Sequence, residues 1–507
     1  MTAESANSLD PNTSALLDAS GLPQVLTSVV GGEWSPRGDG PLHEVADPGT
    51  EEVVGQFEES SSGLVDEAVR NAHVAWTTRW GWIDPAARGR ILHAVAAGFR
   101  EKADVLARLE SLDTGKPLSQ ARGDVAVTVR YLEYYAGLAD KIAGETIAQP
   151  AGSFAYTLRE PYGVVAHITP WNAPLSQMMR GVAPCLAAGN TVVVKPSELT
   201  PLTTALAARI MVEAGLPAGV CNVVLGGGAG TGQALVSHDL VRHITFTGSV
   251  ATGRAVGHVA ADRIVGCNLE LGGKSPTIVM GDADLSAAAA AGALAVIRNS
   301  GQSCFATTRL LVHRSVHDRF VELVAARMQG LSVGHGLEDP DLGPLISDSQ
   351  HARVLSLVAG AREDGAAVVT GGNRPDDVQR GHFLMPTLLS GVTNDMPIAR
   401  QEVFGPVQSV LAFDELEEAI DIANDTEFGL SAGIFTGDVG IAHYVAGRLQ
   451  AGQVQVNRYA GAGVEVPFGG YKSSGLGREK GTEAIHHYTQ LKSVIVATAV
   501  RPTGQEQ

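Results

Sequence analysis

One cysteine of the 507-residue sequence stands in a setting that suits a nucleophile. Cys304 ends the segment Asn-Ser-Gly-Gln-Ser-Cys (299–304), in which small and polar residues follow an alanine-rich stretch. A thiolate is a strong nucleophile when nearby dipoles or charges lower its pKa. The other cysteines, Cys185, Cys221 and Cys267, form no Cys-x-x-Cys pair, so neither a metal site nor a disulfide framework is expected. Because a lone cysteine is more often buried and inert, Cys304 needs companions before a reaction is assigned to it.

Two other side chains are suited to assist such a nucleophile. Glu270 stands between an apolar run and two glycines, where desolvation would raise its pKa and make it a general base. A salt bridge to Lys274 is the alternative. Asn172 follows a β-prone run, and its amide could donate a hydrogen bond to a developing oxyanion. An ordinary turn before Pro174 is the alternative for Asn172.

Several segments suit a phosphate-containing cofactor, although the Gly-x-Gly-x-x-Gly fingerprint is absent. The closest segment, 226–232, has Thr231 where the third glycine is required, yet its backbone still allows a phosphate to approach, unless it is simply a turn. Residues 247–249 (Thr-Gly-Ser) lead from a strand into a helix and suit an anion or a helix cap. Glu198, soon after Lys195 at a strand end, could accept hydrogen bonds from ribose hydroxyls. Its carboxylate would repel a 2′-phosphate, which favours NAD over NADP; a solvated loop charge is the alternative.

The elements that must position these residues alternate between strands and helices. Beta-rich runs are expected at 164–169, 191–195, 220–225 and 243–247, with a helix at about 200–214. Such alternation predicts parallel strands with crossover helices in a doubly wound sheet. A second α/β series follows Leu271, with strands at 277–280, 309–312, 407–413 and 433–436 and helices at 283–299, 316–328 and 416–424. The two series predict two α/β domains that meet near Glu270 and Leu271.

The remaining segments predict helices at one end of the chain and a β structure apart from both sheets. Helical spacing is present at 63–78, 86–112 and 117–140. Residues 141–159 predict a short hairpin outside the main sheet. The strand expected at 493–499 must pair either with this hairpin or with another subunit.

Composition limits the classes of function. The net charge is −17 and no run of Lys and Arg is present, so no nucleic-acid partner is expected. The longest apolar stretch, 285–297, is mostly alanine and too short for a membrane span. Residues 1–23 are rich in Ser, Asn, Asp and Ala and lack the pattern of a signal peptide, which predicts a mobile tail. With reduced thiols, these features predict a cytoplasmic α/β enzyme.

Taken together, the motifs resemble those of the NAD(P)-dependent, non-acylating aldehyde dehydrogenase superfamily, from about Trp34 to Val496. They occur in the family's order and at similar separations. The matching segments are 168–172 (Ile-Thr-Pro-Trp-Asn), 195–198 (Lys-Pro-Ser-Glu), 246–249 (Phe-Thr-Gly-Ser), 270–274 (Glu-Leu-Gly-Gly-Lys), 301–304 (Gly-Gln-Ser-Cys), 402–406 (Glu-Val-Phe-Gly-Pro) and 467–470 (Pro-Phe-Gly-Gly).

The resemblance implies a role for each matched residue. Cys304 is the nucleophile, Glu270 is the general base, and the Asn172 side chain forms the oxyanion hole with the backbone N–H of Cys304. The cofactor is NAD, with NADP as the alternative. The implied cofactor contacts are Ile168, Thr169, Trp171, Lys195, Ser197, Glu198, Gly228, Gly232, Phe246, Ser249, Leu271, Glu402 and Phe404.

The implied reaction is oxidation of an aldehyde to a carboxylic acid through a thiohemiacetal and a thioester on Cys304. Water activated by Glu270 hydrolyses the thioester. A relative that transfers the acyl group to coenzyme A is the alternative, but such relatives typically lack this glutamate. A non-catalytic structural relative is a further alternative, against which the intact Cys304, Glu270 and Asn172 argue.

Three residues bear on the substrate. Ala173 replaces the phenylalanine of many relatives and should widen the substrate tunnel. Arg180 stands where several relatives have tryptophan; it could attract a carboxylate, stack on an aromatic ring, or lie at a surface or interface. Phe305 provides an apolar wall or merely packs. These residues predict a medium-sized apolar or aromatic aldehyde, with an acidic semialdehyde as the alternative.

The resemblance also implies a three-part fold. A Rossmann-like, doubly wound cofactor domain spans 24–140 and 160–270, and a second α/β catalytic domain spans 271–484. A small β oligomerisation arm comprises 141–159 and 485–507. The expected partners are a small-molecule aldehyde and further copies of the chain, in a homodimer or homotetramer, with no nucleic acid and no membrane.

Overall fold

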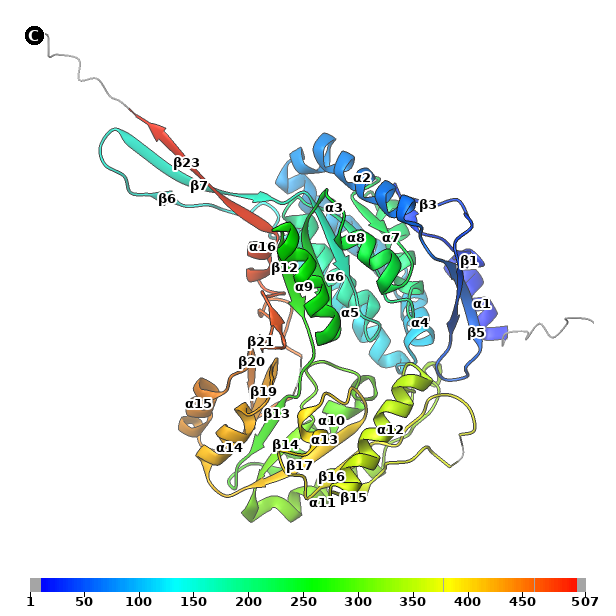
Figure 1. Cartoon of the computed structure of the whole chain (residues 1–507), viewed down its shortest axis with the longest axis vertical. Coiled ribbons are helices and arrows are strands. Elements are labelled where there is room, and N and C mark those ends of the chain that lie inside the picture. The colour runs from blue at the N-terminus through cyan, green and yellow to red at the C-terminus, as the bar shows by residue number, and fades with distance from the viewer. Residues whose placement is uncertain (1–10, 377, 460, 499–507) are drawn as a thin grey trace, which may run out of the picture.

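The computed structural model describes residues 11–376, 378–459 and 461–498. Two mainly parallel sheets, each covered by helices, form the body of the molecule, and a three-stranded sheet projects from it (Figure 1). The α/β class predicted from the sequence is therefore confirmed.

The first sheet has the winding of a nucleotide-binding fold. Its strand order is β22-β12-β11-β8-β9-β10-β2-β3. The strands are β2 (Val29–Val30), β3 (Glu33–Trp34), β8 (Val164–Ile168), β9 (Thr191–Lys195), β10 (Cys221–Val223), β11 (Val241–Thr247), β12 (Gly266–Glu270) and β22 (Gly475–Leu476). The five strands from β8 to β12 run parallel. The chain adds β9 and β10 on one side of β8, then β11 and β12 on the other, which confirms the Rossmann-like, doubly wound topology.

Helices cover both faces of this sheet (Figure 1). One face carries α2 (Ser62–Thr78), α8 (Gln233–Val236) and α9 (Val250–Arg263), and the other carries α3 (Pro85–Glu101), α6 (Pro174–Ala187) and α7 (Leu202–Glu213), with α4 (Ala103–Thr114) and α5 (Leu118–Ala136) behind them. Every residue of β9 (Thr-Val-Val-Val-Lys) is buried, because helices cover both faces of the sheet. Strands buried on both faces typically have such continuous apolar sequences. The helical pattern expected over 86–112 is interrupted at Lys102, where α3 ends and α4 begins.

The second sheet has the order β15-β16-β17-β14-β13-β19-β20, and all neighbours except β15 and β16 run parallel. Its strands are β13 (Pro276–Val279), β14 (Arg309–His313), β15 (Ala367–Thr370), β16 (Thr387–Ser390), β17 (Val407–Phe413), β19 (Ser431–Phe435) and β20 (Gln453–Val456). Its helices are α10 (Leu285–Ile297), α11 (His317–Gln329), α12 (Asp348–Glu363), α14 (Leu416–Asn424) and α15 (Val439–Arg448). Helix α10 is largely alanine and packs closely, with the Gly292 carbonyl accepting a hydrogen bond from Gln408 Nε2 at 2.7 Å.

The projecting sheet joins the hairpin to the last strand. Strands β6 (Thr146–Ile147) and β7 (Ser153–Pro161) form the predicted hairpin, and β23 (Thr489–Ala497) pairs with β7 along its whole length. The last strand therefore finds its partner within the chain. We call these three strands the arm. Residues 499–507, the end of the predicted arm, lie outside the described residues.

Two parts of the fold differ from the sequence-based boundaries. Residues Pro11–Ser20 form helix α1, and Leu16 is buried against the core, so the prediction of a mobile tail is wrong for this segment. Its adjacent leucines give the helix an apolar side that can be buried. Residues 1–10 lie outside the described residues. Strand β22, which was assigned to the second domain, pairs with β12 at the edge of the first sheet.

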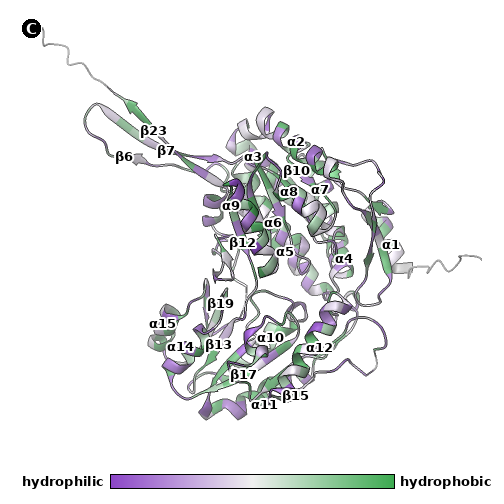
Figure 2. Ribbon diagram, in the orientation of Figure 1, coloured by the Kyte–Doolittle hydropathy of each residue, from purple (hydrophilic) through white to green (hydrophobic). Residues whose placement is uncertain are grey.

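The other elements are short. They comprise a small sheet of β1 (Val25–Leu26), β5 (Val53–Glu58) and β4 (Leu42–Ala46), together with β18 (Phe428–Gly429), β21 (Tyr471–Lys472), α13 (Pro397–Arg400), α16 (Glu483–His487), and the turns η1 (Trp80–Trp82), η2 (Gly228–Gly232), η3 (Arg298–Gly301), η4 (Arg314–Val316) and η5 (Gly336–Glu338). Apolar residues concentrate on the sheet strands and on the helix sides that face them (Figure 2).

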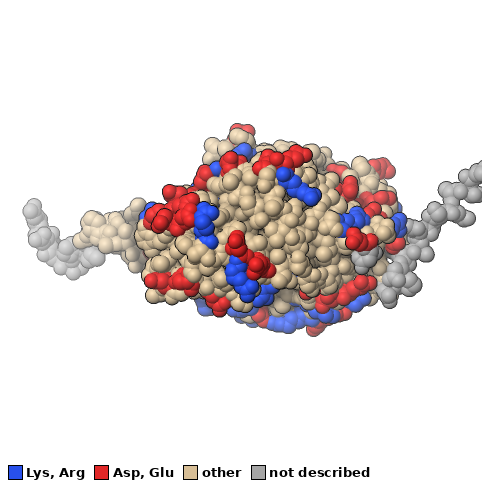
Figure 3. Space-filling model, turned by 90° about the horizontal axis from the view of Figure 1, so that it is seen from below, with Lys and Arg blue, Asp and Glu red and all other residues tan. Residues whose placement is uncertain are grey.

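Acidic and basic side chains are interspersed on the face of the molecule seen in Figure 3. No helix within the described ranges is long and apolar enough to cross a membrane. In the same ranges, no group of three or more His, Cys, Asp or Glu side chains is arranged to hold a metal ion.

Candidate active site

The carboxyl ends of the parallel strands bring many of the predicted site residues to one edge of the first sheet. Ile168 pairs with Lys195 on β9 and with Phe246 on β11. One position further along β11, Thr247 lies beside Glu270 on β12. The direction of winding changes between β8 and β11, and open α/β sheets bind ligands at such a switch point. The edge therefore has the geometry of a cofactor site.

Two features at this edge suit a phosphate. Gly228 begins the helical turn η2 after β10, and a Cβ at this exposed position would contact nothing within 4 Å. The loop surface there is open, whereas Gly232 is buried and its N–H bonds the Gly227 carbonyl at 3.0 Å. Ser249 is the N-cap of α9 and accepts a hydrogen bond from the Thr252 N–H at 3.2 Å. Backbone N–H groups at a helix N-terminus favour bound anions.

A carboxylate suited to ribose hydroxyls follows β9. Lys195 is buried, and its Nζ lies 3.1 Å from Oε2 of Glu198, whose side chain is half exposed. Burial raises the pKa of the Glu198 carboxyl, but the Lys195 ammonium, a backbone hydrogen bond and His43 together lower it below its usual value, so that Glu198 is ionised. Ser197, between them, is partly buried. Glu198 can therefore accept hydrogen bonds from solvent-side hydroxyls at this edge.

A segment of the second domain completes the edge. The Gly273 N–H donates to Oε1 of Glu402 at 3.0 Å. Burial raises the pKa of Glu402 to about 7. Phe404 has a left-handed backbone (φ 56°), and its ring meets Trp171 edge-on at 5.1 Å between centroids. Strained backbone of this kind in a bulky residue clusters at binding sites.

The residues at this edge fit a dinucleotide. The Thr169 hydroxyl is buried and has no hydrogen-bond partner in the described part of the chain, as expected of a group that a ligand satisfies. Leu271 and Phe246 are buried in one apolar cluster at the ends of β12 and β11 and supply apolar surface. Together with the open glycine turn and Glu198, they provide the apolar, phosphate and ribose contacts that a dinucleotide needs.

The loop that carries Cys304 is tightly constrained. Asn299, Ser300 and Gly301 have consecutive left-handed conformations, with φ of 49°, 52° and 72°. A Cβ at Gly301 would lie 2.1 Å from the carbonyl oxygen of Gly405, so only glycine fits there. Gln302 Nε2 donates to the Asn299 carbonyl at 3.1 Å. Non-glycine residues in this conformation cost free energy, so the surrounding contacts must hold the loop in place.

The thiol of Cys304 faces a cavity of about 470 Å³. Burial raises the pKa of Cys304 to about 12, while the positive charge of Arg180 acts in the opposite direction. The thiol is therefore protonated at neutral pH in this state and must lose a proton before it can attack.

Asn172 lies on the wall of the same cavity. Its Nδ2 donates to the Gln302 carbonyl at 3.0 Å, which leaves the second amide proton available for another acceptor. Its backbone carbonyl accepts from Asn299 Nδ2 at 2.8 Å and from Lys116 Nζ at 2.9 Å. Hydrogen bonds thus fix both the side chain and the backbone of Asn172 next to the residues that precede Cys304.

Lys116 is a buried residue that the sequence did not reveal. Besides the Asn172 carbonyl, its ammonium contacts Asp124 at 2.5 Å and Glu110 at 3.5 Å. A buried ammonium with two carboxylates and one carbonyl is fully paired and therefore fixes the position of Asn172. The signal in the sequence was a lysine in the turn before Pro117, at the junction of two apolar helices.

Glu270 lies close to the nucleophile but does not line the cavity. It is 3% exposed, and neither carboxyl oxygen has a hydrogen-bond partner among the described residues. Burial raises its pKa well above the usual value, and Glu479 raises it further. Its Oε1 would be 2.9 Å from a Cβ at Gly469, whereas a Cβ at Gly273 would be 2.4 Å from the Cys304 carbonyl. Gly273, three residues after Glu270, therefore packs directly against the backbone of the nucleophile.

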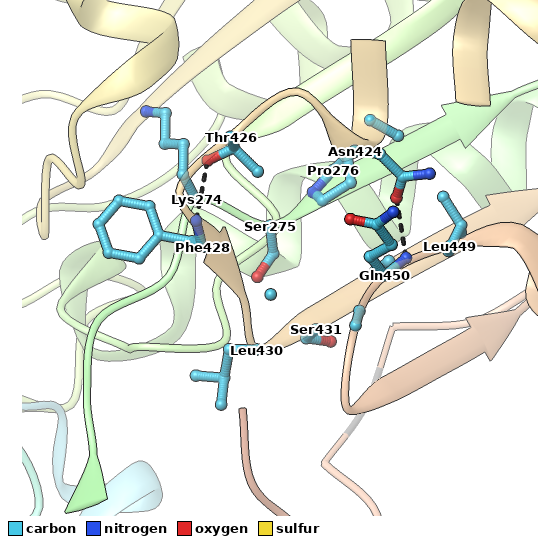
Figure 4. Close-up of a pocket in the computed structure, with 14 residues that line it drawn as sticks. Lys274, Ser275, Pro276, Asn424, Thr426, Phe428, Leu430, Ser431, Leu449 and Gln450 are labelled. Carbon is cyan, nitrogen blue, oxygen red and sulfur yellow. Dashed lines mark hydrogen bonds between the residues drawn. The ribbon is translucent and has the colours of Figure 1, made fainter. Parts of the chain in front are cut away.

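The alternative interpretation of Glu270, a salt bridge to Lys274, is not what the structure shows. The Lys274 ammonium is buried without a hydrogen-bond partner among the described residues, and burial lowers its pKa to about 7. Figure 4 shows its side chain pointing away from Ser275 and Leu430. The cavity drawn there measures only about 10 Å³, too small for a substrate.

Two of the predicted substrate residues line the cavity beside Cys304. Ala173 stands next to Asn172 at the start of α6, where its small side chain leaves space. The Phe305 ring stacks on Tyr459 at 5.8 Å and meets Phe468 edge-on at 6.4 Å. Phe305 therefore both packs and forms an apolar wall beside the nucleophile.

Arg180 also lines the cavity, and it is buried rather than at the surface. Its guanidinium forms an ion pair with Glu479, which is buried as well. It also lies 5.2 Å from the centroid of the Phe468 ring. The alternative of a surface arginine is therefore wrong, and the charge that was expected to attract a carboxylate is already paired. The sequence did not reveal Glu479 or Phe468, although Phe468 lies in one of the recognised motifs.

Comparison with known proteins identifies relatives that match nearly the whole chain. Residues 34–494 match the model of the Aldehyde dehydrogenase family. The human 4-trimethylaminobutyraldehyde dehydrogenase is 43% identical over 455 residues, which covers 89% of this chain and 92% of that protein. The hydroxyisobutyraldehyde dehydrogenase of Mycolicibacterium austroafricanum is 41% identical over 467 residues, which covers 92% of each chain.

A solved structure supports the same placement. The NAD+ complex of the aldehyde dehydrogenase from Bacillus cereus superimposes with a TM-score of 0.93 at 38% sequence identity. The match covers 97% of this chain and 99% of that chain.

Proposed function

Because this chain belongs to the aldehyde dehydrogenase family and is an NAD(P)-dependent oxidoreductase, we propose that it forms a thioester on Cys304 and releases a carboxylic acid. The observation that carries this proposal is one cavity that holds the Cys304 thiol and the Asn172 amide, with the backbone after Glu270 packed against Cys304. When bound at the strand edge, NAD+ supplies the hydride acceptor.

The first half of the reaction depends on Cys304 and Asn172. The thiolate adds to the aldehyde carbon and gives a tetrahedral thiohemiacetal. Negative charge develops on the former carbonyl oxygen, and the second amide proton of Asn172 and the Cys304 backbone N–H donate to it. Loss of a hydride from the adduct leaves a thioester on Cys304.

The second half depends on Glu270. Once ionised, a carboxylate with a raised pKa is a stronger base than an exposed one, so Glu270 can take a proton from water that attacks the thioester. Hydrolysis frees the acid and regenerates the thiol. The presence of this base supports release of a free acid rather than transfer to coenzyme A. The test is NADH formation by the purified protein with aliphatic, aromatic and acidic aldehydes, with and without coenzyme A.

We propose that the residues at the strand edge hold the dinucleotide. Lys195, Ser197 and Glu198 bind the adenosine ribose, and Glu402 and Phe404 bind the nicotinamide ribose. The adenine and pyrophosphate are lined by Gly228, Gly232, Phe246 and Ser249. The nicotinamide is flanked by Ile168, Thr169, Trp171 and Leu271.

Replacement of Glu198 should change the choice of cofactor. In Glu198→Gln the carboxylate that repels a 2′-phosphate is lost, and Lys195 is freed to pair with that phosphate. We expect the ratio of kcat/KM with NADP to kcat/KM with NAD to rise about tenfold or more. Steady-state kinetics with both cofactors measures this ratio. The control is Glu213→Gln, which makes the same charge change at an exposed position on α7. If the NADP-to-NAD ratio in Glu198→Gln were no higher than in Glu213→Gln, the assignment of Glu198 would be contradicted.

We propose that 24–140 and 160–270 form the cofactor domain, that 271–484 form the catalytic domain, and that the arm joins copies of the chain in a homodimer or homotetramer. What supports the last point is exposed apolar surface on the arm. The exposed side chains are Ile147, Phe154, Leu158, Leu491, Ile495 and Val496. Large apolar side chains in such number are typical of an interface.

Charges placed on the arm should break the assembly. Leu491 and Ile495 are four residues apart in β23, so their side chains lie on the same face of the strand. Their exposed fractions are 59% and 74%. We expect the double variant Leu491→Lys/Ile495→Lys to approach the monomer mass of 52.7 kDa in multi-angle light scattering. Val439→Lys, at an exposed apolar residue outside the arm, should keep the wild-type mass. A monomeric wild type, or an unchanged double variant, would refute the role of the arm.

We propose a medium-sized aldehyde as the substrate, with its apolar or aromatic part against Phe305 and in the space left by Ala173. What supports this is a cavity of about 470 Å³ with aromatic side chains beside the nucleophile. Cationic side chains that also line this cavity bear on the rest of the substrate.

A further inference from the structure

The cavity in front of Cys304 carries an unusual set of charges for this chain. Four cationic residues line it, and Asp124 is the one carboxylate among its described lining residues. The cations are Lys116, Arg180, Arg298 and Lys480. The chain as a whole has a net charge of −17, so the excess of cations in the cavity lining is opposite in sign to the charge of the protein. Clefts lined by one sign of charge concentrate ligands of the opposite sign.

Two of the four cations are already neutralised by carboxylates. Lys116 pairs with Asp124 and with the buried Glu110, and Arg180 pairs with the buried Glu479. Arg298 and Lys480, in contrast, form no ion pair with any carboxylate in the described ranges. Two positive charges therefore remain available to a ligand in the cavity.

Lys480 is held in the cavity wall with donor capacity to spare. It is 7% exposed, and its Nζ donates to the Ala462 carbonyl at 2.7 Å. The same ammonium lies 5.8 Å from the centroid of the Phe468 ring. Glu465 and Glu479 act on its charge from a distance without pairing with it. An ammonium has three protons, so at least one remains for an acceptor on the substrate.

Arg298 flanks the same part of the wall from the end of α10. Its Nη1 would be 3.7 Å from a Cβ at Gly461, the neighbour of the residue that Lys480 contacts. Arg298 is exposed and Lys480 is buried, and both line the cavity that Cys304 also lines. The two unpaired cations thus converge on residues 461–462 in the wall of the cavity.

The Phe468 ring is already occupied by protein cations. The Arg180 guanidinium lies 5.2 Å from its centroid and the Lys480 ammonium 5.8 Å. A ring that already makes cation–π contacts with two protein cations offers little free aromatic surface to a third cation. A cationic substrate would also be repelled by Arg298. The wall therefore disfavours an aldehyde that carries a quaternary ammonium group.

We infer that the substrate is a semialdehyde, an aldehyde whose far end carries a carboxylate that Lys480 and Arg298 bind. The apolar or aromatic middle of the molecule lies against Phe305, and the aldehyde carbon reaches Cys304. This inference rests on the proposed function, because it assigns the far end of the substrate in the same cavity.

The test compares matched pairs of aldehydes that differ only in charge. The pairs are 4-oxobutanoate with butanal and 4-carboxybenzaldehyde with benzaldehyde, and 4-trimethylaminobutyraldehyde supplies the cationic case. For the wild type we expect kcat/KM for the acidic member to exceed that of the neutral one by about tenfold or more. The ratio should fall as salt is added, because salt screens the attraction.

Single charge removals locate the binding groups. We expect Arg298→Gln and Lys480→Gln each to lower the ratio of kcat/KM for the acidic aldehyde to kcat/KM for the neutral one by about tenfold. Arg90→Gln, the same change at an exposed position on α3, should leave the ratio at its wild-type value. Because Arg298 is exposed, its replacement does not disturb the core, and an unchanged ratio in that variant would overturn the assignment of the two cations.

The outcomes separate the two levels of the proposal. If the wild type oxidises none of the aldehydes with NAD+ or NADP+, the proposed function fails. If it oxidises them but prefers the neutral or cationic member of each set, the semialdehyde inference fails while the proposed function stands.

Discussion

The variant Cys304→Ala should lose NADH formation with every aldehyde, with a fall in kcat of about four orders of magnitude or more. The reason is that each covalent step is made on this sulfur, which faces the cavity beside the Asn172 amide. Steady-state kinetics measures the loss. Binding of NAD+, followed by fluorescence or calorimetry, should be retained, because the cofactor residues lie along the strand edge and not on the thiol.

Cys267→Ala is the matched control for this loss. Cys267 is the other cysteine that is neither fully buried nor paired, and it lies on β12 away from the cavity. We expect this variant to turn over at close to the wild-type rate. Full activity in Cys304→Ala, or an equal loss in Cys267→Ala, would contradict the role of Cys304.

The variant Glu270→Gln should separate the two halves of the reaction. We expect a burst of about one NADH per active site, followed by a steady state slower than wild type by roughly two to four orders of magnitude. The amide has nearly the shape of the carboxyl but cannot take a proton from water, so the thioester accumulates. Stopped-flow absorbance of NADH resolves both phases.

An added nucleophile provides the control for the burst. Hydroxylamine attacks a thioester without a general base, so it should restore turnover in Glu270→Gln. A variant with wild-type steady-state turnover, or one whose slow phase does not respond to hydroxylamine, would rule out Glu270 as the base for hydrolysis.

The regular elements were largely predictable from the sequence. Strands β9 (Thr191–Lys195) and β17 (Val407–Phe413) and helix α14 (Leu416–Asn424) agree with the predicted bounds residue for residue. Their apolar periodicity and β-branched content are local signals. Strand β12 was not predicted, because Gly-Cys-Asn-Leu-Glu (266–270) lacks β-branched residues and becomes a strand by pairing with β11. Helix α1 was missed because its contact with the core is a tertiary one.

The candidate site was predictable only where a motif carried it. Cys304, Glu270 and Asn172 were found because each lies in a short motif with a characteristic order. Lys116 and Glu479 were not, since their roles exist only through contacts with residues distant in the chain. The sequence could not show that the charge of Arg180 is paired and that the unpaired cations of the cavity lie elsewhere.

The central claim, a covalent acyl group on Cys304, can be tested most directly by mass spectrometry. Glu270→Gln is mixed with aldehyde and NAD+, quenched in acid during the burst, and digested. The account predicts that the peptide containing Cys304 gains the mass of the acyl group, and that Cys304→Ala/Glu270→Gln gains none. An unmodified Cys304 peptide during the burst, or the acyl mass on Cys185, Cys221 or Cys267, would contradict the account.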